Sequence, residues 1–205
     1  MRSFQTFWKG RKDLRKIIGI TGKSGSGKST VAKKIGEVIP NSTVIEVDTI
    51  GHEALCRPNI LENLIVLFGS EILDDLGNVD RKKLGNIVFA ERKKMKELSS
   101  VTYTYITQKI AQIIDEAHNG VVILDWILLP VDPAWQKCDF KILIETDPKL
   151  RKEKVILRDN ISESYFNARE KTSIEYDKSQ FDFVFSNDYS FDTLENIVTT
   201  ISSLM

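Results

Sequence analysis

The sequence is poor in the residues that build disulfide scaffolds and metal centres. It has only two cysteines, Cys56 and Cys138, among 205 residues. They are far apart and lack the spacing of a metal or redox motif, so we expect two ordinary thiols, buried or half-buried. A disulfide between them would in any case be reduced in the cytosol. A fold held together by disulfides or by structural zinc is therefore not indicated.

Long apolar runs and an excess of one charge are also missing. No apolar stretch approaches the roughly 20 residues needed to cross a bilayer. Lysine and arginine number 29, as do aspartate and glutamate, so no net field attracts nucleic acid or a membrane. Residues 1–16 are basic but lack the apolar segment of a secretory signal. We interpret them as a solvated extension, rather than a basic surface arm or a transit-like segment, and expect a cytoplasmic protein.

Five short β-branched runs predict the fold class. Helical patterns separate them, and strands that alternate with helices predict an α/β fold with a parallel sheet covered by helices. The first, third and fourth runs are nearly continuous in apolar residues, as strands buried on both faces should be. The five predicted strands are residues 17–21, 43–47, 121–124, 140–145 and 181–185.

A long interval between the second and third strands contains no strand candidate. Its pattern predicts helices at residues 59–68 and 80–90 and a long helix ending near Ala117. About sixty residues are far more than a crossover connection needs. We therefore expect one α/β domain over residues 17–205 with a helical insertion at about 59–119, which in an enzyme would hold a second substrate.

The most informative motif is G-x-x-x-x-G-K-[ST] at residues 22–29, placed between a predicted strand and a predicted helix. In that context the glycines let successive backbone N–H groups face phosphate oxygens, and the helix N-terminus adds partial positive charge. Lys28 would reach the β- and γ-phosphates, and the Ser29 hydroxyl would bind Mg²⁺. The sequence thus predicts a site for ATP or another nucleoside triphosphate. The expected binding residues are Gly22, Lys23, Ser24, Gly25, Ser26, Gly27, Lys28, Ser29 and Thr30.

Two carboxylates follow predicted strands and should lie beside this loop. Asp125 ends the third strand, where an acid touches the magnesium shell; the alternative is that it caps the following turn. Asp48 follows the second strand and is the expected catalytic base, since a carboxylate there can accept the proton of an attacking hydroxyl. Glu46, expected on the same strand face, is assigned a supporting role.

Cations crowd the segment after the fourth strand, at about residues 149–172. Such a run is often a solvated helix face, but on a closing lid it would stabilise charge on a transferring phosphoryl group. Arg158 and Arg169 are the candidates for that role.

Several further motifs resemble the dephospho-coenzyme A kinase family. They are V-I-E-V-D-T-I at residues 44–50, F-G-S-E-I-L at 68–73, G-x-x-D-R-x-x-L-G-x-x-V-F at 77–89 and F-D-F-V-F-S-N at 181–187. With the phosphate loop, the resemblance extends from about residue 17 to the C-terminus. It implies transfer of the γ-phosphate of ATP to the ribose 3′-hydroxyl of dephospho-coenzyme A, by a monomer or weak oligomer.

The resemblance also implies roles for individual residues. Asp48 would be the base, Lys28 and Arg158 would act on the phosphates, and Asn187 would lie on the adenine side. Arg81 would belong to the acceptor lobe. The expected substrate contacts are Asp48, Arg81, Asp125 and Arg169, and the expected metal ligands are Ser29 and Asp125.

Some positions depart from the family pattern. Ser100-Val101 stand where the family has His-Pro, Pro130-Val131 stand where it has Phe-Glu, and a glutamine expected shortly after Arg169 is absent. These departures leave two alternatives open. One is a kinase for another nucleotide or nucleoside, and the other is a protein that binds ATP without kinase activity.

Overall fold

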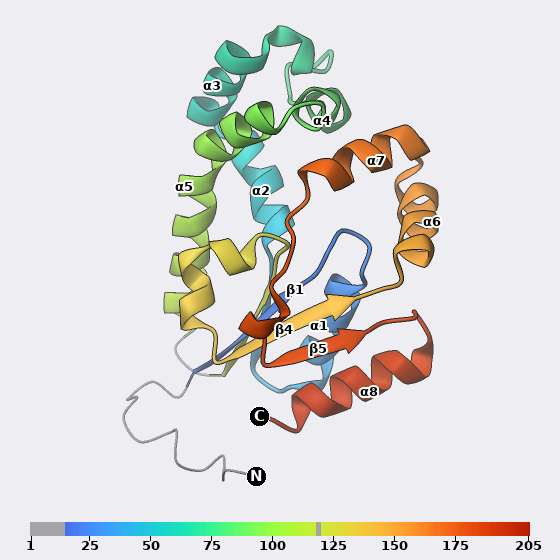
Figure 1. The fold of residues 1–205 in the computed structure, drawn as a ribbon. Coiled ribbons are helices and arrows are strands. Elements are labelled where there is room, and N and C mark those ends of the chain that lie inside the picture. Colours follow the sequence, from blue (N-terminus) through green and yellow to red (C-terminus); the bar gives the residue numbers. More distant parts are fainter. Residues whose placement is uncertain (1–14, 118–119) are drawn as a thin grey trace.

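A five-stranded parallel sheet organises the molecule (Figure 1). The computed structural model describes residues 15–117 and 120–205; of the predicted extension 1–16, residues 1–14 lie outside this range. The strand order is β2-β3-β1-β4-β5, which confirms the predicted α/β fold. The strands are β1 Lys16–Thr21, β2 Ser42–Glu46, β3 Val121–Asp125, β4 Phe140–Glu145 and β5 Phe183–Ser186.

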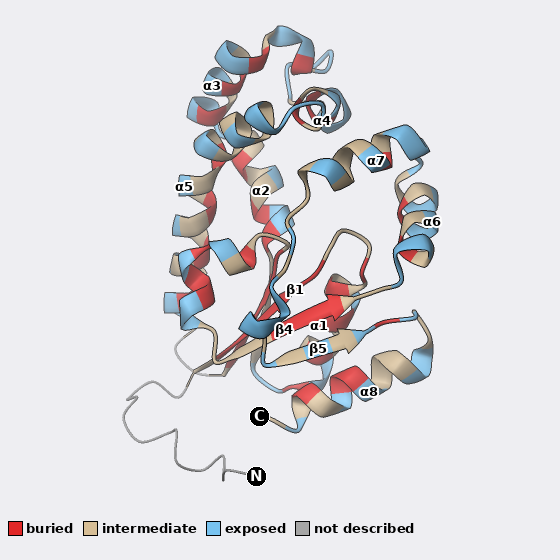
Figure 2. Cartoon of the chain, in the orientation of Figure 1, coloured by how far each residue is buried: buried red, intermediate tan, exposed pale blue. Residues whose placement is uncertain are grey.

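The central strands are buried because helices cover both faces of the sheet (Figure 2). On one face α1 (Lys28–Val38) and α8 (Phe191–Ser202) pack through residues such as Ile35 and Ile201. On the other face the long helix α5 (Arg92–Glu116) contributes Ile110 and Ile114. This two-faced burial explains the apolar runs of β1 and β3 in the sequence.

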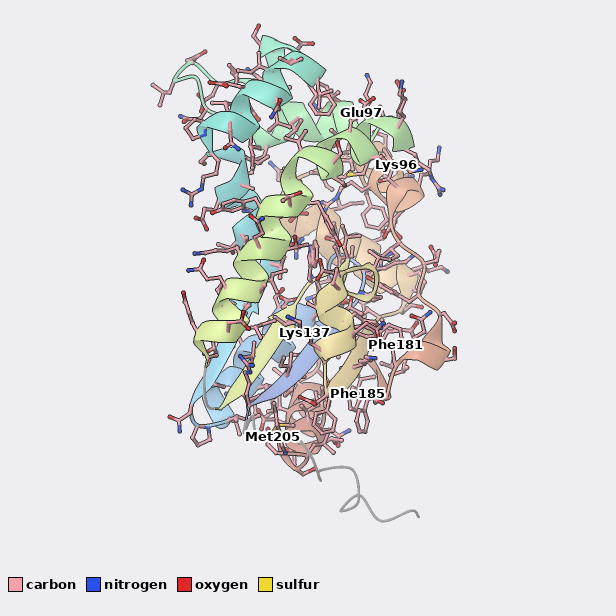
Figure 3. The ribbon with its side chains drawn as sticks, turned by 90° about the vertical axis from the view of Figure 1, so that its left-hand side faces the viewer. Lys96, Glu97, Lys137, Phe181, Phe185 and Met205 are labelled. Atoms are coloured by element: carbon pink, nitrogen blue, oxygen red, sulfur yellow. The ribbon has the colours of Figure 1, made fainter. Side chains whose placement is uncertain are left out.

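In the described part of the connection from β2 to β3, four α-helices and a short 3-10 helix (Ser70–Ile72) form a helical lobe. Three were predicted, α3 (Pro58–Phe68), α4 (Arg81–Val88) and α5; the lobe has its own apolar core. Helix α2 (Val47–Leu55) was not predicted. In Figure 3, α5 runs from the end of the lobe, at Lys96 and Glu97, down to the sheet.

Two further helices, α6 (Pro148–Asp159) and α7 (Glu163–Thr172), connect β4 to β5. Asp147 caps α6 by accepting hydrogen bonds from the N–H groups of Lys149 and Leu150. Asn160, with a φ of 48°, ends it in the left-handed conformation. We call α6 and α7 the lid helices. They lie at the carboxyl ends of the strands, facing the helical lobe (Figure 1).

Within the described residues, no helix combines the length and apolarity that a membrane span requires. Both cysteines are free, as expected. Cys138 is partly buried, but Cys56 is exposed, so the expectation of a buried or half-buried thiol is wrong for Cys56.

Candidate active site

The phosphate loop has the strand-loop-helix context that the motif requires. It leaves β1 and enters α1, for which Gly27 is the N-cap residue. Gly25 and Gly27 have φ angles of 84° and 90°, a region that favours glycine. A Cβ on Gly27 would lie 2.2 Å from Nδ2 of Asn187. The loop conformation and its close packing both explain these two glycines.

Side chains from distant elements hold the carbonyl groups of this loop. Arg151 Nη1 donates to the carbonyl of Ser24 at 3.0 Å, and the Tyr189 hydroxyl donates to that of Gly25 at 2.6 Å. Asn187 Nδ2 donates to the carbonyl of Ser26 at 2.9 Å. In a trans peptide the following N–H points the opposite way, so fixing these carbonyls also fixes the directions of the N–H groups.

Lys28 and Asp125 form a buried ion pair. Lys28 Nζ lies 3.7 Å from Asp125 Oδ1, and the side chains are 9% and 3% exposed. Burial raises the pKa of Asp125, while Lys28 and a hydrogen bond from Ser29 oppose that rise. Asp125 Oδ1 and Ser26 Oγ are buried without a hydrogen-bond partner. Unsatisfied polar atoms of this kind are rare in folded proteins and are typical of a ligand site.

Two cavities share Lys28 and Val155 among their lining residues. The loop cavity measures about 260 Å³, and the lobe cavity measures about 300 Å³. The loop cavity is lined by Gly25, Gly27, Lys28, Ser29, Thr30, Lys154, Val155, Arg158 and Tyr189. The lobe cavity includes Ser24, Lys28, Asp48, Phe89, Met95, Ser99, Ile127, Leu128, Arg169 and Thr172.

Asp48 lies in the first turn of α2, since β2 ends at Glu46. The expectation that Glu46 and Asp48 share a strand face is therefore wrong. The chain turns into a helix at Val47, whose buried side chain packs in the sheet core. Glu46 instead pairs with Lys33 at 3.2 Å, while the exposed Asp48 lines the lobe cavity.

The two predicted lid arginines lie beside different cavities. Arg158 lines the loop cavity and binds Asp159 through Nε at 2.7 Å. Arg169 lines the lobe cavity, donates to Asp159 Oδ2 at 2.9 Å and donates to Ser24 Oγ at 3.0 Å. These arginines, Arg158 above all, lower the pKa of Asp159. The lid helices therefore bring cations to both sides of the phosphate loop.

Arg81 and Asn187 stand further from the cavities. Arg81 Nη1 lies 3.0 and 2.9 Å from the two ring nitrogens of His52. Burial, and next the Arg81 charge, lower the pKa of His52, while Asp48 acts in the opposite direction. Asn187 is buried and supports the loop through its bond to Ser26. Neither residue is among those that line the loop or lobe cavity.

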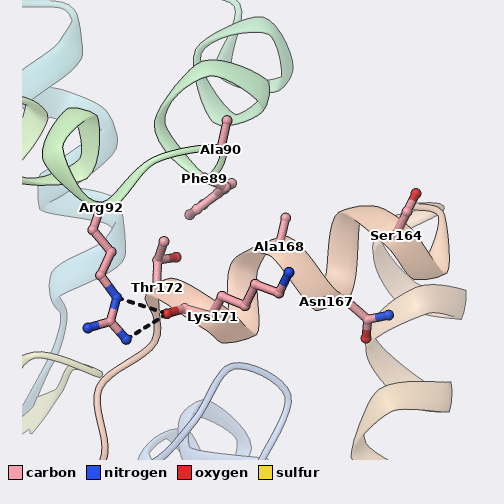
Figure 4. Close-up of a pocket in the computed structure, with 8 residues that line it drawn as sticks. All are labelled: Phe89, Ala90, Arg92, Ser164, Asn167, Ala168, Lys171 and Thr172. Atoms are coloured by element: carbon pink, nitrogen blue, oxygen red, sulfur yellow. Dashed lines mark hydrogen bonds between the residues drawn. The ribbon is translucent and has the colours of Figure 1, made fainter.

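A third cavity, of about 500 Å³, lies where the lid meets the lobe (Figure 4). Phe89 and Thr172 line both this outer cavity and the lobe cavity. Arg92 donates two hydrogen bonds to the carbonyl of Lys171, at 3.2 and 3.0 Å. Phe89 also packs edge-on against Tyr165 of α7 at 5.8 Å. These contacts hold the lid helices against the lobe.

Sequence reasoning missed several residues of the site. On α6, Arg151, Lys154 and Val155 were missed; together with the predicted Arg158 they contact or line the phosphate loop. Their spacing of three and four residues places them on one helix face, and that periodicity was the signal available in the sequence. Tyr189 had no such signal, because it follows Asn187 in a turn-like segment.

The comparisons with known proteins agree with this geometry. The family model described as dephospho-CoA kinase matches residues 16–193. A curated dephospho-CoA kinase of Aquifex aeolicus is 32% identical over 86% of this chain and 91% of its own length. That of Leptospira interrogans serovar copenhageni is 30% identical over 92% of each chain.

Solved structures share the fold. A Thermus thermophilus crystal structure superposes with a TM-score of 0.74 at 25% identity, covering 93% of this chain and 98% of the other. A dephospho-CoA kinase from Campylobacter jejuni gives a TM-score of 0.55 at 21% identity, covering 93% and 98%. The match to the family model, which spans most of the sequence, is decisive: the chain belongs to the dephospho-CoA kinase family.

Proposed function

We propose that this protein transfers the γ-phosphate of ATP to the ribose 3′-hydroxyl of dephospho-coenzyme A, giving coenzyme A and ADP. This is the last step of coenzyme A biosynthesis. Membership of the family supports a kinase that uses ATP as phosphate donor and a small molecule as acceptor. The observation that carries the proposal is that Lys28 lines both the loop cavity and the lobe cavity. A donor in one cavity and an acceptor in the other would both meet this lysine.

The loop cavity suits the donor. Gly25, Gly27 and Thr30 supply backbone around it, and α1 directs its N-terminus toward it. Lys28 and Arg158 are placed to stabilise the charge that develops on the transferring phosphoryl group. Asn187 would act indirectly, since it holds the carbonyl of Ser26.

Ser29 and Asp125 fit a magnesium ion. The described residues contain no group of three or more His, Cys, Asp or Glu side chains suited to a metal. Mg²⁺ commonly binds through one or two protein oxygens together with substrate phosphates and water, so a sparse site is what it requires. The available oxygens are Oδ1 of Asp125, which faces Lys28 but accepts no hydrogen bond, and the neighbouring Ser29 hydroxyl. A bound Mg²⁺ would neutralise charge on the phosphate oxygens.

The lobe cavity suits the acceptor. Asp48, in the first turn of α2, is exposed on its wall and would accept the proton of the attacking hydroxyl. Met95, Ile127 and Leu128 offer apolar surface for a base or ribose. Arg169 adds a positive charge on the lid side, and Arg81 would contact a more distant part of the acceptor.

An assay of ADP release with ATP, Mg²⁺ and dephospho-coenzyme A tests the proposal. We expect release that depends on the acceptor and falls by about 10²-fold or more in Asp48→Asn. A panel of other nucleotides and nucleosides should be phosphorylated much more slowly. Faster turnover of another acceptor would favour a different specificity. Tight ATP binding without turnover of any acceptor would favour an ATP-binding protein that is not a kinase.

Several sequence predictions remain proposals of the same kind. They are the cytoplasmic location, the monomeric or weakly associated state and the absence of nucleic-acid or membrane binding. The boundaries of the extension (1–16), the insertion (59–119) and the lid (149–172) also belong to this group.

A further inference from the structure

A buried arginine on the first lid helix has no part in the reaction described above. Arg151 is only 5% exposed, and arginine is rarely buried to this degree unless it is paired. Its guanidinium forms two hydrogen bonds with Glu170 of α7, from Nη1 at 3.1 Å and from Nη2 at 2.5 Å. It also packs over the ring of Phe166, with Cζ 5.4 Å from the centroid.

The same guanidinium reaches the phosphate loop. Nη1 of Arg151 donates to the carbonyl of Ser24 at 3.0 Å. Glu170, its partner, lies 3.8 Å from Lys23 Nζ. One turn further along α6, Val155 abuts the loop so closely that a Cβ on Gly25 would lie 2.2 Å from its Cγ2. A single buried ion pair therefore joins α6, α7 and the start of the loop.

We propose that Arg151 is a positioning residue that fixes the orientation of the peptide between Ser24 and Gly25 for binding of the ATP phosphates. Its hydrogen bond holds the Ser24 carbonyl on the lid side, so the Gly25 N–H points the opposite way. Glycine crosses between backbone conformations at low cost, so this peptide can reorient once its carbonyl is released. Reorientation would turn a carbonyl dipole toward the phosphates in place of an N–H group.

Glu170 supports this role by orienting and neutralising the guanidinium. Both Arg151 and Arg158 pair with a carboxylate, but Arg151 is buried against the loop backbone, whereas Arg158 lines the loop cavity itself. Arg151 therefore acts by fixing the geometry of the loop. The inference rests on the phosphate-binding part of the proposed function and needs no particular acceptor. The effect should therefore appear in ATP affinity and spare the acceptor KM.

A neighbouring ion pair provides a matched control. Lys152 binds Glu163 at 2.5 Å and so joins the same two lid helices. The contacts of this pair do not include the phosphate loop. Arg151→Met and Lys152→Met each remove one cation from α6 and one link between the lid helices. Only the first also removes a loop contact.

The experiment measures ATP binding by calorimetry, the KM values for ATP and dephospho-coenzyme A, and thermal unfolding for both variants. A hydrogen bond from a charged group contributes about 1.5–3 kcal/mol, so Arg151→Met should raise the Kd and KM for ATP by roughly tenfold or more. The acceptor KM should stay within about twofold of the native value. Lys152→Met should leave all three constants within about twofold, because its pair does not contact the phosphate loop and the Glu163 side chain is 66% exposed.

Two further variants keep the test decisive. Arg151→Lys retains the charge beside Glu170 but replaces the planar guanidinium, which donates to Glu170 and Ser24 at once, by a single ammonium group. It should therefore restore only part of the ATP affinity. If Arg151→Met does not fold, Glu170→Gln tests the same pair and should weaken ATP binding measured by calorimetry. Because Glu170 also lines the lobe cavity, the acceptor KM is not compared for this variant. Equal losses of ATP affinity in the Arg151 and Lys152 variants, or native ATP binding without Arg151, would overturn the inference. An Arg151 effect on ATP binding without any acceptor turnover would uphold it and refute the proposed function.

Discussion

Replacing Asp125 by asparagine should lower the stability of the nucleotide-free protein. It should also increase the rise in Tm that ATP binding produces. The carboxylate is 3% exposed and lies 3.7 Å from Lys28 Nζ. At that separation the attraction is about 4 kcal/mol for an effective dielectric constant of about 20. Removing one partner of a buried pair typically costs about 3–5 kcal/mol, because the other charge is left uncompensated. We take about 3 kcal/mol, since the asparagine oxygen still accepts a hydrogen bond.

Thermal unfolding measures this cost. For a chain of this size about 3 kcal/mol corresponds to a fall in Tm of about 6–12 °C. ATP without Mg²⁺ should then raise the Tm of the variant more than that of the native protein, because the phosphates supply the partner that Lys28 has lost. Adding Mg²⁺ should give the variant little further gain, since Asp125 is the proposed carboxylate ligand.

A surface pair serves as the control. Glu46 lies 3.2 Å from Lys33, but the side chains are 37% and 58% exposed, so Glu46→Gln should cost less than about 1 kcal/mol. If Asp125→Asn melts within about 2 °C of Glu46→Gln, the buried pair does not have the assigned strength. An equal ATP-induced shift in the native protein and the Asp125 variant would refute the idea that phosphate replaces the carboxylate.

Three other substitutions address separate parts of the reaction. Asp48→Asn should cut turnover by about 10²-fold or more while leaving ATP affinity unchanged. Single-turnover kinetics and calorimetry measure the two quantities, and near-native turnover would show that Asp48 is not the base. Arg158→Ala should lower kcat by about 10²-fold with a smaller change in ATP KM, and a pure KM effect in steady-state kinetics would contradict its role in the rate. Arg92→Ala removes both hydrogen bonds to the Lys171 carbonyl. It should raise the acceptor KM about threefold or more and leave the Tm nearly unchanged, and an unaltered KM would show that this contact does not hold the lid for binding.

The parts of the fold that the sequence predicted are those encoded by local patterns. Strand, loop and helix follow one another within residues 16–38, so the motif and its neighbours define the phosphate loop together. Helix α2 was missed because its first residues resemble a strand. Val47 is β-branched and buried, and Gly51 interrupts the helical pattern, yet a Cβ on Gly51 would meet only Ile106 at 3.9 Å.

The supports of the phosphate loop could not be predicted in the same way. The residues that hold its carbonyls lie 127 positions away for Arg151, 161 for Asn187 and 164 for Tyr189. No local period links positions so far apart, and only the folded sheet brings them together. On α6 the cations that matter share a helix face with others that only pair on the surface, such as Lys152. Amino-acid composition alone does not distinguish the cations of α6 that contact the phosphate loop from those that only form surface ion pairs.

Two of the three departures from the family pattern lie away from the lobe cavity. The third, the missing glutamine after Arg169, falls where Thr172 and Ser173 line that cavity. Ser100 is exposed and donates to the carbonyl of Glu97, and Val131 is 63% exposed. Neither lines the lobe cavity, whereas Ser99 and Leu128, close to them in sequence, do. A change of acceptor would have to act on the cavity wall, because discrimination requires contacts that differ between substrates. These two positions are therefore weak evidence for an altered acceptor, and Ser99 and Leu128 are the better sites at which to change specificity.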